Sequence, residues 1–163
     1  MRVGTVKEIK NHEYRVGLTP ESVRELSAHG HDVWVETGAG LGIGADDAEY
    51  EDAGATIKAT AAELFAECEM IVKVKEPQAV ERAMLREGQI LFTYLHLAPD
   101  PEQTKDLVES KAVCIAYETV TGTGGLPLLK PMSQVAGRMS IQAGATALEK
   151  AHGGRGILLG GVP

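Results

Sequence analysis

The sequence predicts an α/β fold: an open, mostly parallel sheet with helices on both faces, followed by one long connecting helix. Short apolar runs alternate with helix-start patterns from Arg2 to Ala116. Strands that are separated by helices pair in parallel, and their sheet needs helices on both faces. After a connector that contains glycine and proline, Ser133–Lys150 places apolar side chains at helical spacing, which predicts the long helix.

The predicted strands are short runs that are rich in apolar and β-branched residues. They are Arg2–Val6, Asp32–Glu36, Ala55–Ile57, Met70–Val74, Ile90–Tyr94 and Ala112–Ala116. The fifth run is followed closely by His96 and then by Pro99, so we expect it to end in a loop at the sheet edge. Open α/β sheets keep their ligand sites at this edge.

The predicted helices begin at N-terminal capping patterns. These patterns are Thr19-Pro20-Glu21, the capping boxes Asp46–Glu49 and Thr60–Glu63, and Asp100-Pro101-Glu102. Glycines at Gly30 and Gly54 are expected to end the first two helices. A further helix is predicted over Ala79–Arg86.

Two segments between these elements have unusual composition. Lys7–Val16 is too highly charged to be buried unless its charges are paired. Thr37–Gly44 contains four glycines, but their spacing does not fit G-x-G-x-x-G, and no lysine follows as in a P-loop. We therefore expect a mobile surface loop there and no phosphate site.

Composition excludes several classes of partner. The 163 residues include only 4% aromatics and carry a net charge of −7, so we expect no nucleic-acid partner. No apolar run approaches the roughly 18–20 residues that span a bilayer, so we expect no membrane partner. The N-terminus enters a strand directly, without a signal peptide, and Cys68 and Cys114 are expected to be reduced core residues. These features predict a cytoplasmic protein.

Polar side chains follow three of the predicted strands at the same edge of the sheet. They are Lys75 and Glu76, Tyr94 and His96, and Tyr117 and Glu118. Because parallel strands present their carboxyl ends together, these groups can converge. Arg15, downstream of the first strand, can fold over the same edge.

Three of these groups suit a small 2-oxo or 2-amino acid. Arg15 offers a planar fork for a carboxylate, Lys75 a point charge for a carbonyl oxygen, and His96 a proton exchanger near neutral pH. Spacing alone leaves other interpretations open: Arg15 as a surface charge, Lys75 paired with Glu76 at a solvated strand end, and His96 as a loop histidine.

Four segments carry a resemblance to a known family. They are Lys10–Val16, Ile71–Pro77, Ile90–Ala98 and Leu126–Arg138. Together they resemble alanine dehydrogenase, within the alanine dehydrogenase and pyridine nucleotide transhydrogenase family, and the similarity runs along essentially the whole chain. It implies a Rossmann-like or flavodoxin-like substrate domain and the reversible conversion of L-alanine, NAD⁺ and water to pyruvate, ammonium and NADH.

The resemblance also implies residue roles. The substrate-binding positions fall on Arg15 and Lys75, and the catalytic histidine falls on His96. A serine that touches NAD falls on Ser133. The family further implies a homo-oligomer, a hexamer. Lys130 and Gln134 depart from the family pattern on either side of Ser133.

The same resemblance divides the chain into a substrate domain, residues 1–130, and an inter-domain helix with the start of an NAD-binding domain, residues 131–163. The G-x-G-x-x-G turn of that second domain is not in the sequence. We therefore predict that the 163 residues alone have no dehydrogenase activity. Two alternatives stay open: the first domain of a transhydrogenase α-subunit, and a non-catalytic module for oxo-acid binding or oligomerisation.

Overall fold

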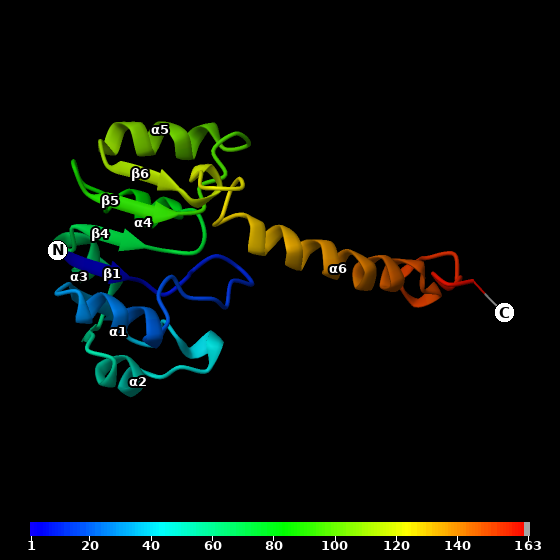
Figure 1. Cartoon of the computed structure of the whole chain (residues 1–163). Helices are drawn as coiled ribbons and strands as arrows, with labels where there is room; N and C mark the ends of the chain where they lie inside the picture. The colour runs from blue at the N-terminus through cyan, green and yellow to red at the C-terminus, as the bar shows by residue number, and fades with distance from the viewer. Residues whose placement is uncertain (162–163) are drawn as a thin grey trace. The chain divides into compact units, whose positions relative to one another are not determined.

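A computed structural model describes residues 1–161 of the chain. The chain divides into two compact units, Met1–Thr119 and a second unit that begins at Val120. The first unit contains one six-stranded sheet in which every neighbouring pair is parallel (Figure 1). Its strands are β1 (Arg2–Thr5), β2 (Asp32–Glu36), β3 (Thr56–Lys58), β4 (Met70–Val72), β5 (Ile90–Thr93) and β6 (Val113–Ala116). The predicted fold class is confirmed.

The strand order is β3-β2-β1-β4-β5-β6, so the chain reverses its direction of travel across the sheet between β1 and β4. β1 pairs with both neighbours: Val3 lies opposite Val33 of β2 and opposite Met70 of β4. In open α/β sheets the ligand crevice lies beyond the carboxyl ends of the strands at such a reversal. A ligand site is therefore expected in the segments that follow β1 and β4.

Helices cover both faces of the sheet. The helices of the first unit are α1 (Pro20–Ala28), α2 (Asp47–Asp52), α3 (Ala61–Glu67), α4 (Ala79–Arg82) and α5 (Pro101–Ser110). One core packs Val23 of α1 and Tyr50 of α2 against Val33 and Val35. The other core contains Leu64 and Phe65 of α3, Leu85 after α4 and Leu107 of α5.

The capping patterns begin helices where the sequence predicts them. The Thr19 side chain accepts from Ser22 N–H, with Pro20 in the first turn of α1. Reciprocal capping boxes begin α2 at Asp46 and α3 at Thr60. These bonds satisfy N–H groups that the first turn of a helix leaves without partners. They connect residues only a few positions apart, which is why the sequence reveals them.

Some boundaries differ from the prediction. β4 ends at Val72 rather than Val74 because the Val74 N–H donates to a glutamate carboxylate instead of a neighbouring strand. α4 is a single turn that ends at Arg82 rather than Arg86. The glycine segment forms a defined 3₁₀ turn, η1 (Leu41–Ile43).

The second unit contains α6 (Lys130–Leu148) and the 3₁₀ turn η3 (Lys150–His152). α6 begins at Lys130 rather than at Ser133, with Pro131 in its first turn, a position that proline favours. No helix in residues 1–161 is long and apolar enough to cross a membrane. Both cysteines are free; Cys68 is buried as expected, whereas Cys114 is only half-buried.

Candidate active site

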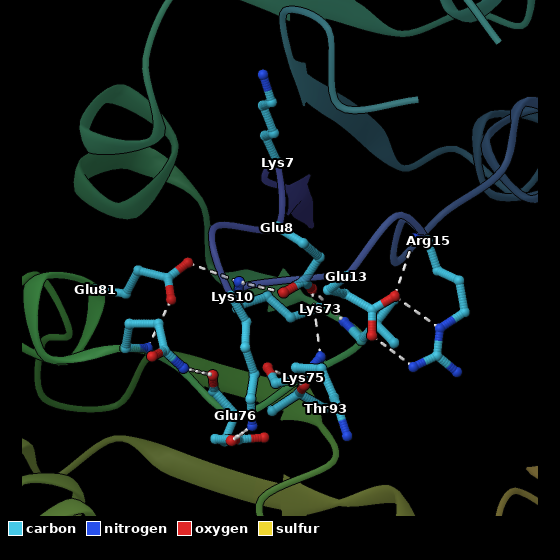
Figure 2. A network of polar contacts seen from close by, with 12 residues as sticks. Lys7, Glu8, Lys10, Glu13, Arg15, Lys73, Lys75, Glu76, Glu81 and Thr93 are labelled. Atoms are coloured by element: carbon cyan, nitrogen blue, oxygen red, sulfur yellow. Dashed lines mark hydrogen bonds and ion pairs between the residues drawn. The ribbon is translucent and has the colours of Figure 1, made fainter. Parts of the chain in front are cut away.

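The candidate site lies at the carboxyl edge of β1, β4 and β5, beside the point where the strand order reverses. The segment after β1 brings its charged side chains onto residues that follow β4 (Figure 2). Each charge of this segment that is buried has a partner, as its composition requires.

Arg15 is held by a nearby carboxylate. Its Nε and Nη2 donate to Oε1 and Oε2 of Glu13 at 2.8 and 2.6 Å, and its backbone N–H donates to Oε1 at 3.0 Å (Figure 2). The Arg15 hydrogen bonds lower the pKa of Glu13 to about 2. The guanidinium is therefore a fixed group, and Glu13 is a permanent anion at neutral pH.

The Arg15 segment is supported from the other side by the glycine turn. A Cβ on Gly42 would lie 2.1 Å from the Tyr14 carbonyl oxygen, so only glycine permits this approach. A cavity of about 100 Å³ remains between the two segments, with Arg15, Glu13 and Glu8 among its lining residues. The glycines therefore shape the wall beside Arg15.

Lys75 is fixed through its backbone and open at its side chain. Its N–H lies 3.4 Å from the Glu8 carboxylate, and its carbonyl accepts a 2.9 Å hydrogen bond from the Thr93 hydroxyl (Figure 2). Within residues 1–161 no hydrogen bond or ion pair engages the Lys75 ammonium group. A fixed backbone with an unengaged ammonium group suits the binding of an oxygen ligand.

Glu8 belongs to a buried ionic triad with Lys73 and Glu81. The Lys73 ammonium donates to Glu8 at 3.1 Å and to Glu81 at 2.6 Å (Figure 2). The side chains of Lys73, Glu8 and Glu81 are 0%, 1% and 3% exposed, and burial raises the pKa of Glu81. Buried ion pairs stabilise a fold only when their geometry is good. This triad connects the segment after β1, the end of β4 and α4.

His96 is positioned by Glu118, which follows β6. The Glu118 carboxylate accepts from the N–H groups of Leu95 at 3.1 Å and His96 at 2.7 Å. His96 has a φ of 49°, in the left-handed region that non-glycine residues seldom adopt. Although burial works in the opposite direction, these N–H groups hold the pKa of Glu118 below its ordinary value. Among the described residues, no group hydrogen-bonds to the His96 ring nitrogens.

Electrostatic and ring contacts connect the three predicted groups. The positive charge of Lys75 contributes to the lowered pKa of Glu13, which itself holds Arg15. The hydrogen bond and the charge of Glu13 raise the pKa of Arg15 against the effect of burial, and the charge of Glu8 adds to this. The rings of Tyr94 and His96 are stacked with centroids 6.3 Å apart. Arg15, Lys75 and His96 thus belong to segments that follow β1, β4 and β5 at the same edge of the sheet.

The structure also describes the contacts of Glu76 and Ser133. Lys75 does not pair with Glu76, because the Glu76 carboxylate is bound by Lys10 (Figure 2). Ser133 lies on α6 in the second unit, where its exposed hydroxyl donates to the Leu129 carbonyl at 3.4 Å.

Sequence reasoning missed Glu8, Glu13, Lys73 and Glu81 as site residues. Glu8 and Lys73 are separated by 65 positions, so no local pattern connects them. The available signal was a lysine inside an otherwise apolar strand run, Met70–Val74, which needs a buried partner.

Fold and site together define an α/β domain of the Rossmann type with a candidate anion site at the reversal point of its sheet. Residues 4–136 match the family model described as alanine dehydrogenase/PNT, N-terminal domain. The chain is 61% identical to alanine dehydrogenase of Halomonas elongata and 51% identical to that of Mycobacterium tuberculosis, each over 164 aligned residues that cover 100% of this chain and 44% of the relative.

Solved structures agree with these matches. An L-alanine dehydrogenase structure superimposes with a TM-score of 0.88 and 52% identity, over 100% of this chain and 45% of that one. A transhydrogenase from Sinorhizobium meliloti matches with a TM-score of 0.68 and 33% identity, over 72% of this chain and 34% of that one. The chain belongs to the alanine dehydrogenase/PNT family through its N-terminal domain, and it spans less than half the length of these relatives.

Proposed function

We propose that this chain forms the substrate domain of an NAD-dependent alanine dehydrogenase, which converts L-alanine, NAD⁺ and water to pyruvate, ammonium and NADH in a reversible reaction. The observation that carries the proposal is the position of Arg15, Lys75 and His96 at one sheet edge, where the described residues form no hydrogen bond with the Lys75 ammonium or the His96 ring nitrogens. The high identity to alanine dehydrogenases supports it.

The three groups have complementary roles in this reaction. Arg15 binds the substrate carboxylate, because a guanidinium presents paired donors that match it. Lys75 holds and polarises the carbonyl or hydroxyl oxygen at the reacting carbon. His96 donates and accepts the proton through the carbinolamine and imine steps, since both forms of an imidazole are accessible near neutral pH.

NAD⁺ supplies the hydride acceptor when it is bound. In this chain the residue proposed to contact it is Ser133, on the inter-domain helix. Its hydroxyl is exposed and donates to Leu129, so the oxygen retains lone pairs that suit an amide or hydroxyl donor of a nucleotide. The division at residues 130 and 131, the hexameric assembly and the cytoplasmic location are part of the same proposal.

The proposal is tested by steady-state kinetics on the natural protein that carries this chain, at its full natural length. We expect NADH-dependent reductive amination of pyruvate. His96→Ala should lower kcat by about 10²–10⁴-fold if the imidazole transfers the proton. His29→Ala, on the C-terminal cap of α1, is the matched control and should leave kcat unchanged.

Absence of pyruvate turnover in the wild-type protein would contradict the proposed function. A rise in KM alone for His96→Ala would show that the imidazole binds substrate without transferring a proton.

A further inference from the structure

We propose that Glu13 is the positioning residue of Arg15 and limits the site to a substrate with a single carboxylate. The inference rests on the proposed function, in which Arg15 binds the substrate carboxylate. It concerns which side of the guanidinium the substrate meets and how much positive charge it finds there.

The bonds to Glu13 occupy one side of the guanidinium and leave the other open. An arginine side chain has five N–H groups in a rigid plane. Glu13 uses the side formed by Nε and Nη2, at 2.8 and 2.6 Å. The end formed by Nη1 and Nη2 keeps a second pair of parallel N–H groups, and among residues 1–161 no acceptor binds Nη1. A substrate carboxylate can therefore bind end-on while Glu13 stays in place.

Glu13 is built into the site. Its side chain is 7% exposed, whereas that of Arg15 is 47% exposed. Its carboxylate also accepts the Arg15 backbone N–H at 3.0 Å, which fixes it independently of the guanidinium. With a pKa of about 2 it stays ionised throughout the pH range in which a histidine can exchange protons. Fixed in this way, it holds the guanidinium in one orientation.

The charge balance follows from the same contacts. Arg15 and Lys75 contribute cations beside the site, and Glu13 neutralises the guanidinium that it contacts. The open end of that guanidinium has the donors for one carboxylate. A second carboxylate on the substrate would meet Glu13 on the Nε side of Arg15. The two anions would repel each other there.

The test is a double-mutant cycle for pyruvate kinetics in the natural full-length protein. We expect Glu13→Gln to raise the KM for pyruvate by about tenfold or more with a smaller effect on kcat, because a mispositioned fork binds the carboxylate poorly. Arg15→Lys should raise this KM by about tenfold or more, since lysine lacks the fork. If Glu13 acts through Arg15, adding Glu13→Gln to Arg15→Lys should change KM by less than about twofold.

Glu67→Gln is the matched control, because it removes one of the two carboxylate partners of another arginine, Arg2, at the opposite edge of the sheet. We expect unchanged kinetics for this variant. The specificity arm measures 2-oxoglutarate, a dicarboxylic 2-oxo acid, as a competitive inhibitor against pyruvate. In Glu13→Gln the ratio of its inhibition constant to the pyruvate KM should fall by about fivefold or more, because the second carboxylate gains a free cation.

Each other result has a definite meaning. Independent effects of the two substitutions on KM would overturn the positioning role. A lower pyruvate KM in Glu13→Gln would show that Glu13 competes with the substrate for Arg15. An unchanged ratio for 2-oxoglutarate would remove the specificity role. A wild-type protein without pyruvate turnover would instead refute the proposed function on which the inference rests.

Discussion

His96 owes its conformation to Glu118, 22 positions further along the chain. A positive φ is uncommon for a residue that has a Cβ atom. The N–H groups of Leu95 and His96 both donate to the Glu118 carboxylate. Backbone strain of this kind persists only where the surroundings hold it. Gln103 adds a hydrogen bond from its side chain to the Leu95 carbonyl at 2.6 Å. The position of the imidazole is thus fixed through the backbone of Leu95 and His96, and among the described residues no hydrogen bond to the ring nitrogens adds to this.

Glu118→Ala tests this residue. Without the carboxylate, the His96 backbone relaxes and the imidazole loses its position, so we expect kcat for pyruvate amination to fall by about tenfold to a hundredfold. Glu109→Ala on α5, where the side chain is 65% exposed, is the control and should leave kcat unchanged. The measurement is steady-state kinetics, with thermal unfolding to confirm that both variants fold. An unaltered kcat in Glu118→Ala would show that His96 needs no such support.

At the scale of elements, carboxylates accept backbone N–H groups just past the carboxyl ends of two strands. Glu8 accepts the Val74 N–H at 2.6 Å just past the end of β4, and Glu118 does the same just past β5. A strand whose next N–H is taken by a side chain can leave the sheet without an unpaired polar group. Lys75 and His96 therefore follow strand ends that are fixed by carboxylates. The fixed end before Lys75 depends on the triad that keeps Glu8 buried.

Lys73→Met tests the triad. The substitution leaves the carboxylates of Glu8 and Glu81 buried without a cation, so we expect the free energy of unfolding to fall by about 3–5 kcal/mol. Lys105→Met, at a position where the side chain is 72% exposed, should change it by less than about 0.5 kcal/mol. Urea unfolding measures both. The double variant Lys73→Met/Glu81→Gln should recover part of the loss, and a single variant as stable as wild type would contradict the role of the triad.

At the scale of the whole molecule, the first unit has both cores of an α/β sheet but leaves part of one face exposed. In β6, Val113 and Ile115 are 50% and 38% exposed, while the alternating Cys114 and Ala116 pack on the core beneath α5. The chain also covers only 44% of the length of its alanine dehydrogenase relatives. The proposed reaction needs groups from both a substrate domain and an NAD-binding domain.

We therefore expect residues 1–163 alone to show no steady turnover of L-alanine and NAD⁺. Absorbance of NADH at saturating substrate measures this, and circular dichroism confirms that the chain is folded. The natural protein at full length is the positive control. Turnover by the isolated 163 residues would show that this chain supplies a complete active site.

The sequence by itself determined the fold class, the capped first turns of α1, α2, α3 and α5, and the two strands, β4 and β5, that Lys75 and His96 follow. Capping boxes such as Thr60–Glu63 and apolar periodicity depend on residues a few positions apart, so they can be recognised in the sequence alone. Only the tertiary structure decided which charges meet. Glu8 reaches Lys73 across 65 positions, and Glu118 reaches His96 across 22, because the sheet topology makes their strand ends neighbours. Burial then makes the ion pair of Glu8 with Lys73 obligatory, since an unpaired charge in the interior is far more costly than a paired one.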